Sequence, residues 1–265
     1  MHGPSTVRTM RALLAGTLVA ALLAGCEGIV PAPPIGGLAT PDIAAGQPSI
    51  EPGDVRFTCG RIPFDPAILA QRRTDETADT AVAGALRKHL ARDEMDIAWL
   101  PDAGWTLVGQ DAQGAEFVAP GEGEQAYVVV SVGPLIGEPQ ASFAVGGLAV
   151  DGWGGCTPTR VLPAGIGIAT WELAPGEAVG PATTGVDVLV TERDCASAQS
   201  SEGRIVGPEV VPTAEAVTIT FAVWGLPGAQ MCPGNPATRV RVTLPEPLRD
   251  RRLLDGSTLP AKPRS

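Results

Sequence analysis

The stretch AVTITFAVW, residues 216–224, shows the clearest strand pattern in the chain. Its larger apolar residues occupy every second position, which places them on one face of an extended strand: Val217, Ile219, Phe221 and Val223. Thr218, Thr220 and Ala222 lie on the other face. A strand with one apolar face has to cover it with other strands or helices, so this half of the chain is predicted to be built on a β-sheet.

Other short strands surround this one in the sequence. We predict them at 167–173, 186–191, 205–211 and 239–244, separated by turns rich in Gly and Pro, and no segment between them has helical periodicity. Short strands joined by such turns are typical of a β-sandwich. Residues 161–258 are therefore predicted to form an all-β, sandwich-like part, followed by a disordered tail at 259–265.

Residues 55–158 differ because they contain one amphipathic helix. In TDETADTAVAGALRKHLARDE, residues 74–94, apolar residues recur at every fourth position: Ala78, Val82, Leu86 and Leu90. Thr74 or Asp75 is expected to cap its start, and Arg87, Lys88 and Arg92 match the helix dipole at its end. Strands are predicted at 105–108, 116–118, 126–132 and 143–153, and the Val-rich run 126–132 is expected to be buried on both faces. The fold class is thus expected to be α+β followed by all-β.

Five cysteines add a constraint on this fold. Four of them, Cys59, Cys156, Cys195 and Cys232, allow three pairings. We favour Cys59–Cys156 and Cys195–Cys232, because each pair closes one of the two predicted parts. The cysteines do not form a C-x-x-C motif, which argues against a structural zinc site. We expect neither a metal nor a cofactor.

The fifth cysteine, Cys26, ends an apolar run. Residues 12–25 are apolar and follow Arg8 and Arg11, but fourteen residues fall short of the roughly 20 that a membrane-spanning helix needs. A basic start and a short apolar run are the pattern of a secretory signal peptide. The end of the run, Leu23-Ala24-Gly25-Cys26, resembles a bacterial lipobox.

This resemblance implies that residues 1–25 are removed and that Cys26 carries lipid. The protein would then be anchored to the cell membrane on its extracytoplasmic side. Residues 26–54 are rich in Pro and Gly, so we expect them to form a tether. Losing the two arginines of residues 1–25 would move the formal charge from −10 to −12. That charge argues against nucleic acid as a partner, because phosphates repel acidic surfaces.

A second resemblance covers most of residues 161–258. VLVTERDCASAQ, residues 188–199, and CPGNPATRVRVTLPEPLRDRRLLDGS, residues 232–257, resemble segments of uncharacterised secreted proteins from high-G+C Gram-positive bacteria. This resemblance implies no activity.

No motif in the sequence predicts a reaction. P-loop, G-x-S-x-G and H-E-x-x-H patterns are absent. His89 is expected to be a helix-terminal residue favoured by the dipole. Three groups of carboxylates could supply the acid and base of a glycoside hydrolase: Asp93, Glu94 and Asp96; Glu122 and Glu124; Glu192 and Asp194. Each group lies at a predicted turn or strand end, where solvated acidic residues are common.

Two further features could mark a binding surface. The chain has five tryptophans: Trp99, Trp105, Trp153, Trp171 and Trp224. We expect most of them to be buried in the core and one or two to lie at the surface. Arg249, Arg251 and Arg252 form a local basic patch that could dock a carboxylate-bearing partner. We therefore expect a non-enzymatic module that binds an envelope protein, a cell-wall polymer or a small ligand. The alternatives are a hydrolase of envelope polymers and a structural role in envelope assembly.

Overall fold

The computed structural model describes residues 55–71, 80–92, 98–122, 125–135 and 144–265. All of them belong to one compact unit. The predicted signal peptide, residues 1–25, and tether, residues 26–54, lie outside the described residues, as does the predicted helix cap at Thr74 or Asp75.

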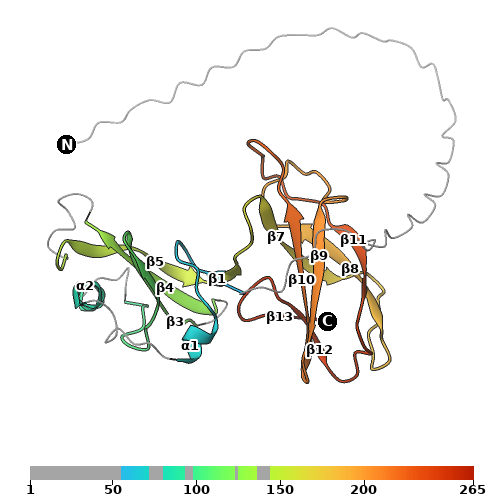
Figure 1. Ribbon diagram of the computed structural model, residues 1–265, viewed down its shortest axis with the longest axis horizontal. Coiled ribbons are helices and arrows are strands. Elements are labelled where there is room, and N and C mark those ends of the chain that lie inside the picture. Colours follow the sequence, from blue (N-terminus) through green and yellow to red (C-terminus); the bar gives the residue numbers. More distant parts are fainter. Residues whose placement is uncertain (1–54, 72–79, 93–97, 123–124, 136–143) are drawn as a thin grey trace, which may run out of the picture. The chain divides into compact units, whose positions relative to one another are not determined.

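Seven strands of the C-terminal half form one hydrogen-bonded sheet (Figure 1). The strands are β7 (Ile166–Leu173), β8 (Gly185–Glu192), β9 (Ile205–Pro212), β10 (Ala216–Trp224), β11 (Thr238–Thr243), β12 (Arg252–Asp255) and β13 (Lys262–Arg264). The order is β11-β8-β7-β10-β12-β13, and β9 pairs with β10. The five strands expected from the sequence are all present, and the all-β character of this part is confirmed.

The alternation in β10 decides which face is the core. The four larger apolar side chains of β10 are fully buried: Val217, Ile219, Phe221 and Val223. They form one cluster with residues of β7, β8, β11 and β12. The opposite face is covered too, because Thr220 and Ala222 are also buried. A Cβ atom on Gly256 would lie 2.4 Å from the Thr220 hydroxyl oxygen, so the chain after β12 packs directly on this second face.

β10 changes partners along one of its edges. β9 follows one edge from Val217 to Val223. On the other edge, Ala216–Ile219 pairs in parallel with β12, and Phe221–Trp224 pairs antiparallel with β7. The strands β7 and β12 therefore part at Thr220. Beyond this point, β12 and β13 continue the sheet on one side, and β7, β8 and β11 continue it on the other. This separation gives the single sheet its sandwich-like form.

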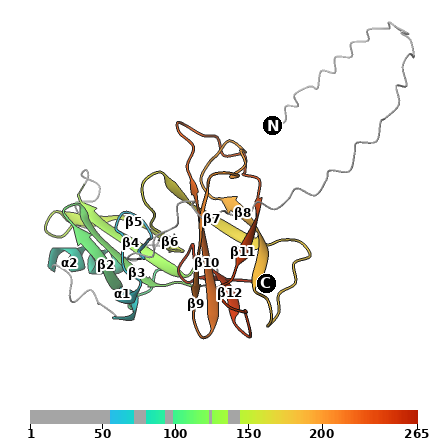
Figure 2. The same ribbon diagram turned by 45° about the vertical axis from the view of Figure 1, so that its right-hand side comes forward.

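The N-terminal half contains a four-stranded antiparallel meander, β2-β3-β4-β5. Its strands are β2 (Thr106–Asp111), β3 (Gly114–Pro120), β4 (Tyr127–Pro134) and β5 (Leu148–Cys156). Helix α2 (Thr80–Leu90) lies beside this sheet (Figure 2), and its Val82, Ala85 and Leu86 are buried against it. One helix on an antiparallel sheet confirms the predicted α+β class. Arg87 and Lys88 lie in the last turn of the helix as predicted, whereas Arg92 follows its end at Leu90.

A second segment covers the other face of the meander. β1 (Phe57–Thr58) and the short helix α1 (Ala67–Ala70) belong to it, and Phe57 and Phe64 pack on Val108 and Val118. The sheet is thus covered on both faces. We predicted two-sided burial for β4, but β4 alternates between buried and half-buried residues. It is β3 that is buried on both faces, because it lies between β2 and β4 and under both covering segments.

Two sequence predictions are corrected at strand ends. The strand expected at 143–153 begins only at Leu148, because Gly146 and Gly147 adopt positive φ angles of 59° and 80° and form a turn. The tail expected to be disordered, residues 259–265, contains β13, which pairs with β12 through Leu253↔Arg264 and Asp255↔Lys262. Arg264 also forms an ion pair with buried Asp255, and this anchors the segment.

Both favoured disulfides are present, Cys59–Cys156 and Cys195–Cys232. The boundary predicted between residues 158 and 161 falls in a short strand, β6 (Thr159–Arg160). This strand pairs with β1 on one side. On the other side, the amide of Arg160 donates to the Ser257 carbonyl and Thr159 forms a bridge with Thr258. β6 therefore joins segments from both ends of the described chain.

Glu116 on β3 holds the loop after β1 in place. Its side chain is fully buried, and its carboxylate accepts hydrogen bonds from the backbone amides of Arg61 at 2.6 Å and Ile62 at 3.3 Å. A Cβ atom on Gly60 would lie 2.5 Å from a Glu116 oxygen, so only glycine allows this approach. The carboxylate thus satisfies two backbone amides, of which the Ile62 amide would otherwise be buried without an acceptor.

Replacing Glu116 with Gln tests this role. One carboxylate oxygen becomes an amide group that donates instead of accepting, so one of the two backbone amides loses its partner. We expect the free energy of unfolding to fall by about 1–3 kcal/mol, measured by urea denaturation. The same substitution at exposed Glu122 is the control and should change stability by less than about 0.5 kcal/mol. Equal stability of both variants would contradict the assigned role.

Candidate functional site

A cleft opens where β7 and β12 part. It has a volume of about 760 Å³ and is bordered by β7, by residues that follow β8 and β12, by β13 and by the segment around β6. We call it the β7–β12 cleft. It exists because the same edge of β10 pairs with β12 before Thr220 and with β7 after it. β7 and β12 are therefore not hydrogen-bonded to each other, and a gap opens between them. At this point the Ile219 carbonyl accepts hydrogen bonds from the Gly256 amide and the Trp171 indole.

β7 supplies one wall of the cleft. Ala169 and Trp171 point into the core, so the residues between them, Ile168 and Thr170, lie on the outer face with Glu172. Arg193 comes next to this face because its amide donates to the Ile168 carbonyl. Glu172 and Arg193 are exposed. This wall therefore combines a small apolar area with two opposite charges.

The C-terminal strands supply the other wall, and Asp255 organises it. Asp255 is 1 % exposed, and its two carboxylate oxygens have different partners. One accepts from the Ser257 amide at 2.9 Å, and the other accepts from the Arg264 guanidinium at 2.6 Å. The guanidinium carbon of Arg264 also lies 6.0 Å from the centre of the Trp171 ring. One buried carboxylate thus fixes both Ser257 and Arg264 at the cleft.

Two polar atoms of this wall have no hydrogen-bond partner among the described residues. They are the Ser257 hydroxyl oxygen and the Arg264 Nε, and both are buried. Ser257 as a whole is 1 % exposed. A buried donor without an acceptor costs about 1–3 kcal/mol, so such groups are uncommon and call for an explanation. Both belong to residues that border the same cleft.

The charges around the cleft divide into paired and unpaired groups. Arg160 is buried and forms a short ion pair with Glu209 of β9, and Arg264 is paired with Asp255. Arg193 and Lys262 make no ion pair within the described part of the chain, nor do Glu172 and Asp194. Four basic and two acidic residues border the cleft in a protein whose formal charge is −10. Because Arg160 and Arg264 are paired, the unpaired charges that border the cleft are two basic and two acidic, without the acidic excess of the whole chain.

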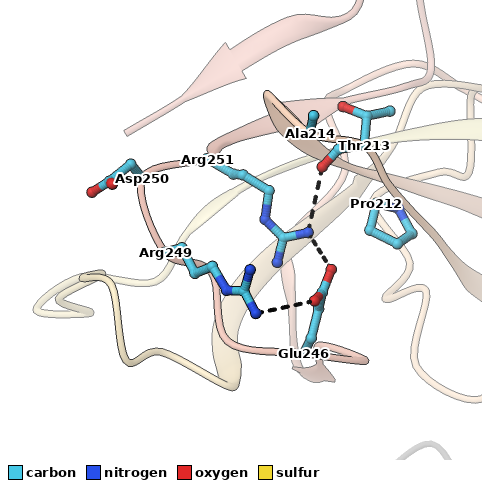
Figure 3. Close-up of a pocket in the computed structure, with 7 residues that line it drawn as sticks. All are labelled: Pro212, Thr213, Ala214, Glu246, Arg249, Asp250 and Arg251. Carbon is cyan, nitrogen blue, oxygen red and sulfur yellow. Dashed lines mark hydrogen bonds and ion pairs between the residues drawn. The ribbon is translucent and has the colours of Figure 1, made fainter.

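The three arginines of the predicted docking patch have different surroundings, and Figure 3 shows two of them, Arg249 and Arg251. The Arg251 side chain is 7 % exposed and donates to Glu246 at 2.5 Å and to the carbonyls of Pro247 and Leu248. Its donors are thus used to brace the turn before β12. Arg249 is 72 % exposed, and Arg252 is exposed at the start of β12. Docking through these two exposed arginines stays a prediction.

The carboxylates proposed as an acid–base pair have different surroundings. Glu192 is buried and accepts two hydrogen bonds from the Arg204 guanidinium, at 3.0 and 2.6 Å. This fixed ion pair leaves Glu192 without a free oxygen for a substrate. Asp194 is exposed and borders the β7–β12 cleft, and Glu122 is exposed elsewhere. Asp93, Glu94, Asp96 and Glu124 lie outside the described residues.

The tryptophans divide between core and surface. Trp105 and Trp171 are buried, whereas Trp99, Trp153 and Trp224 are 52 %, 37 % and 42 % exposed. One more tryptophan than expected therefore reaches the surface. None of the three borders the β7–β12 cleft. His89 is buried in the last turn of α2, where its ring packs on Trp153 with centres 4.8 Å apart, so its position is explained by packing.

Apart from Asp194, the residues of the cleft were not singled out by sequence reasoning. Ser257, Lys262 and Arg264 fell in or beside the segment expected to be a disordered tail, and Arg160 fell between the two predicted parts. Within the described ranges, no three His, Cys, Asp or Glu side chains gather closely enough to hold a metal ion. In the same ranges, no helix is both long enough and apolar enough to span a membrane.

Comparison with known proteins gives no relative. No protein-family model matches the chain, and neither a curated protein nor a solved structure matches it.

Proposed function

We propose that this chain is a lipid-anchored protein on the extracytoplasmic side of a bacterial cell membrane, and that it binds an envelope component without catalysing a reaction. The β7–β12 cleft is the observation that carries the binding role. The pattern that ends at Cys26 supports the anchor. The two disulfides support an oxidising compartment outside the cytoplasm, because cytosolic thiols are kept reduced.

The cleft has the features of a binding site for a polar group. It combines a volume of about 760 Å³ with exposed charges and with two buried donors that have no partner in the described part of the chain. The alternative, a hydrolase with paired carboxylates, loses support from Glu192 because Arg204 holds both of its oxygens. Glu172 and Asp194 also border the cleft, so the same experiment should test binding and cleavage.

The experiment is co-sedimentation of the full chain, in detergent, with insoluble cell-wall polymer. We expect the wild-type protein to sediment with the polymer and to release no soluble fragments. The double substitution Arg193→Glu and Lys262→Glu should lower the bound fraction at least about tenfold, because it reverses two charges that border the cleft and have no ion-pair partner in the described part of the chain. The matched control reverses the exposed Arg249 and Arg252.

Three other results would change this proposal. Release of fragments would favour the hydrolase. Loss of binding in the Arg249 and Arg252 variant alone would favour the docking patch. Equal sedimentation of all variants would exclude both surfaces as the binding site for this polymer.

The anchor is tested separately by replacing Cys26 with Ala. The lipobox resemblance leads us to expect a variant that keeps the mass of its precursor and takes up no labelled palmitate in growing cells. Replacement of Cys195 and Cys232 by Ala is the control, because those cysteines form a disulfide and should not affect labelling. Wild-type processing and labelling of the Cys26 variant would show that the anchor lies elsewhere or is absent.

A further inference from the structure

The donors of the β7–β12 cleft share one chemical property. Arg193, Lys262 and Arg264 are cationic, and Ser257 offers a hydroxyl group. Arg193 and Lys262 are exposed at the cleft. Arg264 gives one nitrogen to Asp255 and keeps an Nε–H without a partner among the described residues. Guanidinium and ammonium groups only donate hydrogen bonds, so their complement is an acceptor.

The two unpartnered donors are fixed close to one acceptor. The oxygens of a single carboxylate, Asp255, hold the Ser257 amide at 2.9 Å and an Arg264 nitrogen at 2.6 Å. The Ser257 hydroxyl and the Arg264 Nε–H are only a few bonds from these anchored atoms. Asp255 has thus already used both of its oxygens on the anchoring bonds. No described residue accepts from the two remaining donors, so an acceptor from outside the protein would satisfy them.

A negatively charged oxygen group satisfies these donors best. Hydrogen bonds between cationic donors and a carboxylate or phosphate are about twice as strong as those between neutral groups. A neutral sugar would bring no negative charge to Arg193 and Lys262, which have no ion-pair partner in the described part of the chain. A metal ion fits less well, because these two cations would repel it and no potential metal cluster occurs in the described ranges.

We propose that the β7–β12 cleft binds an oxyanion, a carboxylate or a phosphate, carried by the envelope component. This inference rests on the proposed binding function and adds the chemistry of the group that is recognised. Ser257 and Arg264 contact the oxyanion, and Arg193 and Lys262 attract it. Glu172 and Asp194 carry like charge and oppose it.

The test is calorimetric titration of the full chain in detergent, at constant ionic strength, with three probes. These are inorganic phosphate, acetate and glucose, which separate the two oxyanion sources from a neutral polar ligand. We expect saturable binding of phosphate or acetate and none of glucose. Rising salt should weaken the binding, because the cleft charges that attract the anion are exposed.

Four variants connect this binding to the cleft. Ser257→Ala should weaken anion binding about tenfold, the size expected for losing one hydrogen bond to a charged group. Lys262→Gln should weaken it about threefold, because it removes an attracting charge that does not contact the anion. Glu172→Gln should strengthen it about threefold, because it removes a like charge. Arg249→Gln is the control and should bind as the wild type does, because its arginine borders a different depression.

The stability of the Ser257→Ala variant distinguishes a binding role of Ser257 from a structural one. Ser257→Ala removes a buried hydroxyl that has no partner among the described residues, so the unliganded variant should unfold at the same urea concentration as the wild type or a higher one. A purely structural serine would lower stability and leave anion affinity unchanged. That result, binding of neither anion, or equal weakening by Arg249→Gln and Lys262→Gln would overturn the inference.

The two proposals can fail independently. Polymer sedimentation that persists while neither anion binds would leave the proposed function standing and overturn the oxyanion. Anion binding that depends on Lys262 and Ser257, without sedimentation, would support the oxyanion site and reject the cell-wall polymer as its carrier.

Discussion

Replacing Arg204 with Met is expected to lower the free energy of unfolding by about 3–5 kcal/mol, the usual cost of removing one partner of a buried ion pair. The Glu192 side chain is 1 % exposed, and in the wild type both of its oxygens bind the Arg204 guanidinium. Without this guanidinium the carboxylate stays buried with no counter-charge. Arg204 also donates to the carbonyls of Ser200 and Trp224, so the end of β10 loses a contact too.

The size of this effect is measured by urea denaturation against two other variants. Arg239→Met removes an ion pair with Asp187 in the same sheet, but the Arg239 side chain is 49 % exposed, so at most about 1 kcal/mol should be lost. The double variant Arg204→Met and Glu192→Met removes both charges and should recover most of the loss. A double variant as unstable as the single one would show that packing, not charge, is responsible.

Removing the Cys59–Cys156 disulfide is expected to cost about 4–5 kcal/mol, because the bond closes a loop of 97 residues in the unfolded chain. Both cysteines should be changed to Ala so that no free thiol remains. The Cys195–Cys232 bond closes 37 residues, and its removal should cost about 4 kcal/mol. The two disulfides thus have similar expected effects despite their different loop lengths.

Urea denaturation of the oxidised wild type and the two alanine pairs measures these differences. Peptide mapping without reductant should first show which bonds each protein contains. An unchanged denaturation midpoint in the Cys59 and Cys156 variant would mean that the unfolded chain is already restricted in this region. A much larger loss would indicate that the bond also holds the segment at β1 against the meander.

Regular strands were predictable from the sequence, and irregular pairings were not. The strand expected at 216–224 has the same bounds in the structure, and that expected at 186–191 grew by one residue at each end. Period-two alternation over eight or nine residues defines such strands locally. β12 and β6 have four and two residues, too few for a period, and they pair with β10 and β1, which lie far away in the sequence. Their pairing is decided by the folded chain.

The candidate site was less predictable than the fold for a related reason. Its residues come from four separate segments, and no local pattern marks any of them. Arg251 and Arg193 look alike in the sequence, since each stands beside an acid in a turn-like segment. In the structure Arg251 is buried and fully bonded, whereas Arg193 is exposed at a cleft. Burial, which depends on tertiary packing, separates the structural arginine from the available one.

The ladder between β1 and β6 has a consequence for folding kinetics. It pairs Phe57 with Arg160, so it belongs to the contacts of high sequence separation that slow the folding of β proteins. The Cys59–Cys156 bond lies inside the same loop, next to this ladder. Once the bond has formed, the two strands are neighbours along the covalent path, and most of the loop-closure entropy has already been lost. The oxidised chain should therefore refold faster than the reduced one, with a lower effective contact order.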